Sequence, residues 1–161
     1  MNTSVDEKFM NEALKEAQKA RQELEVPIGA VIVFENEIIS RGRNKRETSK
    51  NALLHAEIEA IDKACKKLGR WRLNGCTLYV TLEPCPMCSG AIINSRISRL
   101  VYGASDPKAG SCGSVINLFE LPYNHIPQIE KGILSQNCSK ILSDFFKSLR
   151  AKSNPKADLK V

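Results

Sequence analysis

Two short motifs, both suited to binding a metal, constrain how this chain can fold. The first is His55-Ala56-Glu57, and the second is Pro84-Cys85-Pro86-Met87-Cys88. One imidazole and two thiolates form a ligand set that suits zinc. A fold that lets His55, Cys85 and Cys88 bind one ion must bring together two segments that are distant in the sequence.

The number of ligands favours a catalytic zinc site. A structural zinc site has four protein ligands, whereas a catalytic one has three and leaves the fourth position to water. The two motifs supply three. Glu57 is too close to His55 to lie beside it as another ligand on a helix, but its carboxylate can reach a metal-bound water. A zinc hydroxide next to a carboxylate is suited to hydrolytic attack on a polarised carbon.

Other interpretations of the Cys-x-x-Cys pattern remain open on these residues alone. The pattern is also typical of redox pairs and of half of a structural four-ligand site. The remaining cysteines and His125 could complete such a site, although none lies at ligand spacing from another Cys or His. These cysteines are Cys65, Cys76, Cys112 and Cys138. The order His-x-Glu followed by Pro-Cys-x-x-Cys favours catalysis, because it resembles the signature of the zinc deaminases.

Hydrophobic periodicity predicts helices that alternate with strands. The segment from Val26 to Phe34 is β-branched and almost entirely apolar, which indicates a strand buried on both faces. Gly69 is a natural C-cap, and Pro86 suits the first position of a helix that begins at Cys85. The predicted helices cover 5–24, 54–68, a segment from 85 and a segment from 135; the predicted strands cover 26–34, 37–42, 76–82, 98–103 and, more weakly, 128–131.

This order predicts an α/β protein, a three-layer α/β/α sandwich around a central mixed sheet of about five strands. The 161 residues fit one domain, expected over 1–152, followed by a basic tail over 153–161. The first residues do not resemble a signal peptide, and no apolar run is long enough to cross a bilayer. Since six cysteines are too few for a disulfide scaffold of this size, we expect a cytoplasmic protein with no membrane partner.

The net charge of +6 is concentrated in two places. The segment 140–161 contains six basic and two acidic residues. The segment 41–50 contains five basic residues and Glu47. Two basic clusters are consistent with binding a polyanion such as RNA, but lysine-rich segments also simply keep proteins in solution.

Beyond the two motifs, the chain resembles the bacterial tRNA adenosine deaminases of the cytidine deaminase superfamily. The resemblance extends over roughly residues 5–152. The matching segments include 26–31, 77–85, Tyr102-Gly103-Ala104-Ser105-Asp106-Pro107-Lys108, Asn124-His125, 131–134 and Asp144-Phe145-Phe146. It departs from the family where Ala52-Leu53-Leu54 replaces the usual Pro-Thr-Ala before His55, near the expected pocket wall and a possible dimer contact.

The resemblance implies a cytidine deaminase-like fold and a zinc-dependent hydrolase that converts adenosine to inosine at wobble position 34 of tRNA. A zinc hydroxide would attack C6 of a flipped-out adenine. His55, Cys85 and Cys88 resemble the zinc ligands, one ion per subunit, and Glu57 the residue that moves the protons. The substrate would be a tRNA anticodon stem-loop, tRNA-Arg with anticodon ACG in this family, and the enzyme a homodimer.

The resemblance also suggests residues that bind the RNA. Asn44 resembles the residue that hydrogen-bonds the flipped purine, and the backbone amide of Ala56 is placed like one that meets the edge of the base. The positions around the anticodon loop are Asp106, Phe145, Phe146 and Arg150. Each also has a purely structural interpretation: Asn44 and Asp106 are ordinary turn residues, and adjacent phenylalanines are usually core residues, of which one here could be an exposed stacking platform. His125 is expected to be structural.

Two rival functions remain. A deaminase of free guanine, cytosine or a nucleoside such as cytidine would use the same catalytic motif, but it would not require basic clusters or the Phe145-Phe146 helix. A non-catalytic, zinc-containing RNA-binding protein predicts a fourth protein ligand and no chemical role for Glu57.

Overall fold

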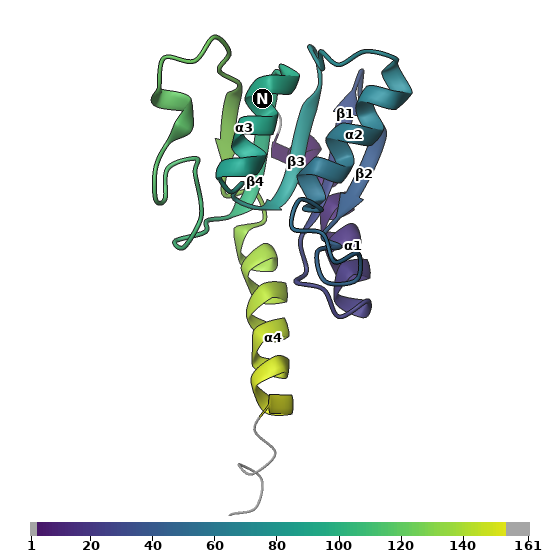
Figure 1. Ribbon diagram of the computed structural model, residues 1–161, viewed down its shortest axis with the longest axis vertical. Helices are drawn as coiled ribbons and strands as arrows, with labels where there is room; N and C mark the ends of the chain where they lie inside the picture. The colour runs from purple at the N-terminus through teal and green to yellow at the C-terminus, as the bar shows by residue number, and fades with distance from the viewer. Residues whose placement is uncertain (1–2, 154–161) are drawn as a thin grey trace, which may run out of the picture.

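The computed structural model describes residues 3–153, which form a mixed sheet between two layers of helices (Figure 1). This confirms the predicted three-layer arrangement. The elements in chain order are α1 (Thr3–Gln22), β1 (Gly29–Phe34), β2 (Glu37–Arg43), α2 (Ala56–Leu68), β3 (Thr77–Leu82), α3 (Pro86–Ser95), β4 (Arg99–Ala104), the short 3-10 helix η1 (Leu118–Glu120), β5 (Gln128–Lys131) and α4 (Ser135–Ser153). The tail expected over 153–161 lies outside the described residues after Ser153.

The sheet has the strand order β2-β1-β3-β4-β5. β1 is antiparallel to both β2 and β3, whereas β3, β4 and β5 are parallel. The β1–β2 hairpin turns at Glu35 and Asn36, both of which have positive φ. A register shift between Ile32 and Val33 interrupts that pairing. The parallel half places the carboxyl ends of β3 and β4 at one edge of the sheet, where loops usually form binding sites.

Each face of the sheet is covered by a pair of helices. Alternate residues of β1 belong to the two cores: Ala30 and Ile32 pack beneath α2 and α3, whereas Val31 and Val33 pack beneath α1 and α4. β1 is therefore buried on both faces, as its apolar sequence predicted. Among residues 3–153, no helix is both long and apolar enough to span a membrane.

Two glycines of the hairpin allow the helices to approach the sheet closely. A Cβ atom at Gly42 would lie 2.1 Å from the carbonyl oxygen of Ala56, and a Cβ at Gly29 would lie 2.0 Å from that of Ala13. Only a residue without a side chain fits at either position. Gly42 thus sets the distance between β2 and the first turn of α2, while Gly29 does the same for α1 on the opposite face.

The buried face of α2 differs from the predicted one. Helical spacing over 54–68 predicts a buried row of Ile58, Ile61, Cys65 and Leu68. The fully buried row is instead Ala56, Ala60 and Ala64, with Ile61, Cys65 and Leu68 only partly buried beside it. Small residues lie at the contact because α2 packs almost directly on the backbone at Gly42.

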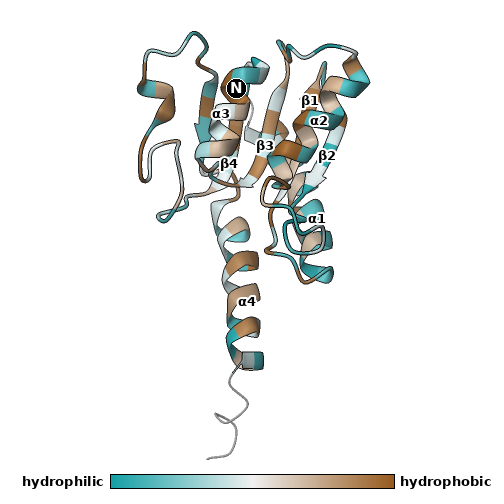
Figure 2. Cartoon of the chain, in the orientation of Figure 1, coloured by the Kyte–Doolittle hydropathy of each residue, from teal (hydrophilic) through white to brown (hydrophobic). Residues whose placement is uncertain are grey.

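Helix α4 extends beyond the sheet (Figure 1). Hydrophobic residues recur along its whole length (Figure 2), but only Cys138 and Phe145 are buried. Phe146 and Leu149 remain 41% and 42% exposed. Helical spacing predicts core packing along one apolar row of this helix, formed by Cys138, Ile141, Leu142, Phe145, Phe146 and Leu149. In the structure Ile141 and Leu142 are only partly buried and Phe146 and Leu149 are exposed, because the sheet ends before the helix does.

Candidate active site

Two helix N-termini meet at the carboxyl edge of the sheet and carry the three candidate metal ligands. His55 is the N-cap of α2, and Cys85 is the N-cap of α3, with Pro86 at the first helical position as expected. Cys88 follows in the first turn of α3. β3 ends immediately before Glu83-Pro84, so its register aims the start of α3 at the start of α2.

The ligand atoms of His55, Cys85 and Cys88 fit a tetrahedral metal ion. All three lie within 4.8 Å of one another, and each sulfur is 3.6 Å from Nδ1 of His55. Tetrahedral zinc with ordinary Zn–N and Zn–S bonds requires an N···S separation of about 3.5 Å. The group contains three ligands and no fourth within residues 3–153. The site therefore matches the pattern of a catalytic rather than a structural zinc site.

The remaining cysteines and His125 have other surroundings. Cys65 contacts the carbonyl oxygen of Trp71, and Cys112 lies 3.6 Å from the hydroxyl of Ser89. His125 contacts the carbonyl oxygen of Ile97 at 2.7 Å, which agrees with a structural role. No disulfide joins any two of the six cysteines, all of which lie within residues 3–153.

The local electrostatics favour a thiolate at Cys85. A hydrogen bond from Cys88 and another from His55 lower the pKa of Cys85 to about 4, although burial acts in the opposite direction. The same thiol–thiol hydrogen bond, together with burial, raises the pKa of Cys88. The hydrogen bond with Cys85 also raises the pKa of His55. In all three shifts the largest cause is a hydrogen bond to another candidate ligand.

Glu57 lies beside the ligands and is not one of them. It is 4% exposed, and burial raises its pKa to about 6. A carboxyl group whose pKa lies near neutrality can both accept and donate a proton under working conditions. Its position in the wall of the cavity described below makes it available to a bound substrate.

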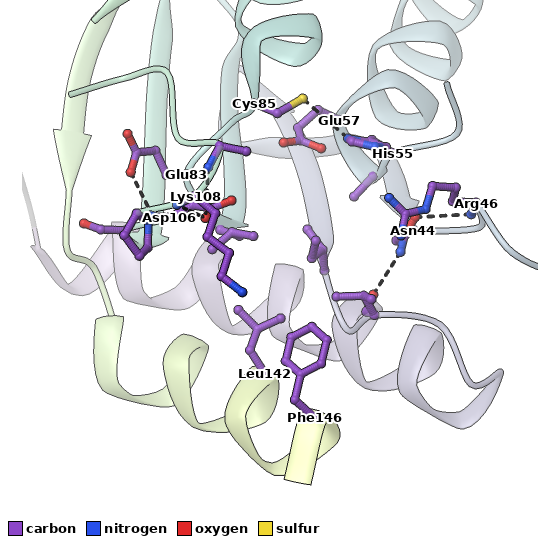
Figure 3. Close-up of a pocket in the computed structure, with 17 residues that line it drawn as sticks. Asn44, Arg46, His55, Glu57, Glu83, Cys85, Asp106, Lys108, Leu142 and Phe146 are labelled. Atoms are coloured by element: carbon purple, nitrogen blue, oxygen red, sulfur yellow. Dashed lines mark hydrogen bonds between the residues drawn. The ribbon is translucent and has the colours of Figure 1, made fainter. Parts of the chain in front are cut away.

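A cavity of about 420 Å³ opens from these residues towards α4 (Figure 3). His55, Glu57 and Cys85 gather at its inner end, and Phe146 of α4 lies at its mouth. Besides Phe146, the apolar residues on the wall are Val26, Ile28, Ala56, Leu82, Pro107, Ala109 and Leu142. A largely apolar cavity of this size with a few convergent polar groups is typical of small-molecule and base-binding sites.

Asn44 and Asp106 lie on opposite sides of the cavity (Figure 3). Asn44 is 5% exposed; its Oδ1 accepts the backbone N–H of Arg46 at 3.2 Å, and its Nδ2 donates to the carbonyl oxygen of Val26 at 3.3 Å. Asp106 accepts the N–H of Lys108 at 3.0 Å. Both are therefore turn residues, as their structural interpretation predicted, and both also face the cavity.

The residues expected on α4 separate into three environments. Phe146 lines the cavity, whereas Phe145 is 4% exposed and packs against Phe146 with the rings edge to face, 5.5 Å apart. Arg150 is exposed one turn further on, outside the cavity lining. The structure thus brings Phe146 to the pocket and does not bring Phe145 or Arg150 there.

The segment Ala52-Leu53-Leu54 does not form the cavity wall. Leu53 is 59% exposed and Leu54 is partly buried, and neither lines the cavity. The segment lies near the pocket, as expected, only in that the next residue, His55, lines the cavity. Exposure of Leu53 leaves it available for an intermolecular contact.

The basic cluster at 41–50 is mostly neutralised by residues that are distant in the sequence. Three of its five cations form ion pairs with distant acidic residues: Arg41 with Glu12 of α1 at 2.8 Å, Arg43 with Glu23, just after α1, at 2.8 Å, and Lys45 with Glu59 of α2 at 2.5 Å. The cluster is therefore not the open basic patch that its local sequence indicated. Its Arg46, together with Lys108 from another loop, lines the cavity.

Sequence reasoning missed Glu83, which also lines the cavity. Glu83 is 2% exposed and accepts hydrogen bonds from the loop that follows β4. Burial alone would raise its pKa, but the hydrogen bonds from Ser114, Asp106 and Cys112 together lower it. The sequence signal for Glu83 was its place directly before Pro84-Cys85. That place did not reveal which backbone N–H groups would bind its carboxylate.

Comparisons with known proteins agree with this geometry. A model of the family described as MafB19-like deaminase matches residues 4–150. The tRNA-specific adenosine deaminase of Bacillus subtilis (strain 168) is 53% identical over 148 residues, which cover 91% of this chain and 92% of that protein. The tRNA-specific adenosine deaminase of Streptococcus pyogenes serotype M18 is 48% identical over 145 residues, covering 89% and 91% respectively.

Solved structures show the same fold. One from a study of A-to-I editing by tRNA:A34 deaminases superimposes with a TM-score of 0.81 at 45% identity and covers 83% of this chain and 98% of that one. The guanine deaminase of Nitrosomonas europaea superimposes with a TM-score of 0.76 and covers 86% of this chain and 83% of that one. Its identity is 24%, so that likeness concerns the fold alone.

Proposed function

The chain belongs to the MafB19-like deaminase family, and we propose that it hydrolyses adenosine to inosine at wobble position 34 of a tRNA anticodon. The observation that carries this proposal is the three-ligand group of His55, Cys85 and Cys88 beside buried Glu57, at the inner end of a cavity large enough for a base. The high identity to tRNA-specific adenosine deaminases over nearly the whole chain supports adenosine in tRNA as the substrate.

His55, Cys85 and Cys88 would hold one zinc ion, since their types and separations fit it. When bound, zinc lowers the pKa of a water molecule to about 7 and so supplies hydroxide at neutral pH. Glu57 accepts the proton of the attacking water and delivers protons to the ring nitrogen and to the departing amino group. Adenosine and water thereby yield inosine and ammonia, and Glu57 returns to its starting state.

The other wall residues bind and orient the base. Asn44 hydrogen-bonds the purine, and the backbone N–H of Ala56 meets its edge at the start of α2. The exposed ring of Phe146 offers a stacking surface at the mouth of the cavity, where a flipped-out nucleotide enters. Asp106 and, further along α4, Arg150 would contact the adjoining anticodon loop; Phe145 acts through Phe146, against which it packs.

The direct test is deamination of an anticodon stem-loop that carries adenosine at the wobble position, with free adenosine, cytidine and guanine in parallel. We expect inosine in the RNA and no turnover of the free compounds. The variant Glu57→Gln should abolish deamination and retain zinc, whereas Cys88→Ala should lose the metal. Turnover of free guanine or cytidine instead, or full activity of Glu57→Gln, would overturn the proposal.

Three finer assignments accompany the reaction. The family resemblance supports tRNA-Arg with anticodon ACG as the substrate, which a panel of stem-loops with different anticodons would test. It also supports a homodimer, and exposed apolar residues between β4 and β5 offer a surface for one: Val115, Ile116, Tyr123 and Ile126. Light scattering of the purified protein measures this directly. A tRNA substrate is consistent with a cytoplasmic location.

A further inference from the structure

A buried carboxylate organises one whole wall of the cavity. Glu83 follows β3 and is 2% exposed. Its Oε1 accepts the backbone N–H groups of Cys112 at 3.1 Å and Ser114 at 3.0 Å. Its Oε2 accepts the backbone N–H of Asp106 at 2.9 Å and the hydroxyl of Ser114. One side chain thus binds both ends of the loop 105–114.

The loop is built around this carboxylate. A Cβ atom at Gly110 would lie 2.4 Å from both Cδ and Oε2 of Glu83, so the loop backbone packs directly against the carboxylate. The N–H of Ser111 also donates to the carbonyl oxygen of Pro84 at 2.9 Å. A buried charge that accepts three backbone N–H groups is costly to replace, because each unpaired amide loses its hydrogen bond without regaining water.

The same loop supplies polar groups to the cavity. Asp106 and Lys108 line it opposite Asn44 and Arg46 (Figure 3). Asp106 in turn accepts the N–H groups of Lys108 and Ala109, so the position of this short segment follows from the Asp106–Glu83 contact. Glu83 itself is too enclosed by the loop to bind an RNA chain.

We propose that Glu83 is a positioning residue, whose carboxylate holds Asp106 and Lys108 where they bind the nucleotides beside the reacting base. The inference rests on the proposed function for the identity of the ligand. It assigns Glu83 a role in substrate binding rather than in the proton transfers, which remain with Glu57.

Glu83→Gln isolates the contact that matters. Glutamine has one acceptor oxygen and one NH2 group. The NH2 group is a donor, so it is disfavoured at the Oε1 position, where the backbone N–H groups of Cys112 and Ser114 both donate. The amide therefore lies at the Oε2 position, where the Ser114 hydroxyl can turn and accept. The variant keeps the bonds to Cys112 and Ser114 and leaves the N–H of Asp106 without an acceptor.

We expect Glu83→Gln to retain zinc and a kcat within about twofold of wild type, with KM for the stem-loop raised about tenfold. Amide hydrogen exchange should accelerate at Asp106 and stay slow at Cys112 and Ser114. Gly110→Ala places a Cβ atom of the loop against the carboxylate of Glu83, displaces the loop, and should raise KM similarly. Ser114→Ala removes only the hydroxyl and should have the smallest effect among the loop variants.

Glu37→Gln provides the charge-matched control, since Glu37 is exposed at the start of β2, the end of that strand remote from Asn44. It should behave as wild type. Unchanged KM together with unchanged exchange at Asp106 in Glu83→Gln would overturn the inference. The inference would also be overturned if kcat fell in proportion to the zinc lost while KM stayed constant. Glu83 would then serve only to hold Cys85 in place.

Failure of the proposed reaction is distinguishable from failure of this inference. If the wild-type protein binds the stem-loop without deaminating it, the proposed reaction is wrong. The affinity for the stem-loop, measured by fluorescence anisotropy, then takes the place of KM in the comparison. Binding about tenfold weaker in Glu83→Gln then still supports the positioning role, and equal binding refutes it.

Discussion

The close packing of β2 against α2 predicts that Gly42→Ala damages the active site from a distance. The added Cβ would lie 2.1 Å from the carbonyl oxygen of Ala56, whereas such contacts are essentially never shorter than 3.0 Å. Strand and helix must therefore separate by about 0.9 Å. His55 precedes Ala56 directly and Glu57 follows it, so the displacement acts on a metal ligand and on the proton-transfer group.

Gly42→Ala should lower both the stability of the protein and its catalytic rate. Overpacking of this kind costs about 1–3 kcal/mol in the free energy of unfolding. A displacement of about 1 Å at a catalytic group can lower the rate by on the order of a hundredfold. We therefore expect Gly42→Ala to fold with reduced stability, to bind zinc more weakly and to lose about 10- to 100-fold in kcat/KM when saturated with zinc.

Gly29→Ala is a matched control because it makes the same kind of clash on the opposite face. Its Cβ would lie 2.0 Å from the carbonyl oxygen of Ala13, so it displaces α1, from which no cavity-lining residue comes. It should lose similar stability in urea unfolding and keep its zinc affinity in a chelator competition. Equal loss of zinc affinity in the two variants, or wild-type kcat/KM in Gly42→Ala, would refute the reasoning.

Three further predictions concern other parts of the molecule. Arg99 donates to Asp6 at 2.7 Å and lowers the pKa of Asp6 below 3.8. The stability that this pair contributes is therefore present above pH 4 and is lost as the pH falls further. In urea unfolding, Asp6→Asn should lack that part of the acid dependence. Phe145→Ala should lower the free energy of unfolding by about 3–5 kcal/mol, whereas exposed Phe146→Ala should change it little and raise KM for the RNA. Chelation of the metal should abolish activity and lower the melting temperature, and zinc should restore both; full activity in chelator would exclude the metal mechanism.

Local patterns predicted much of the fold and the metal group. The apolar run before Phe34 predicted a strand buried on both faces, and Gly69 and Pro86 predicted helix boundaries that the structure confirms. His55 and the cysteines could be recognised because each motif is short and carries its own chemistry. Their convergence followed from the order of strands and helices.

Long-range pairing could not be predicted in this way. Arg41 and Arg43 were interpreted as part of an open basic cluster because their partners, Glu12 on α1 and Glu23 just after it, are far away in the sequence. Glu83 resembled an ordinary residue at a strand end because its donors arrive only after β4 and a long loop. Helix α4 was assigned a buried apolar face because its sequence does not reveal where the sheet beneath it ends.

The division of the cavity into an inner end and a mouth affects how such an enzyme can diversify. The inner end is formed by two helix starts and by close backbone contacts such as that of Gly42 with Ala56, where added bulk costs stability. The mouth is formed by Phe146, Arg46 and Lys108, which project from a helix surface and two loops. Substitutions there are tolerated by the fold, so evolution or a laboratory library can exchange one RNA for another while the deamination chemistry is inherited intact.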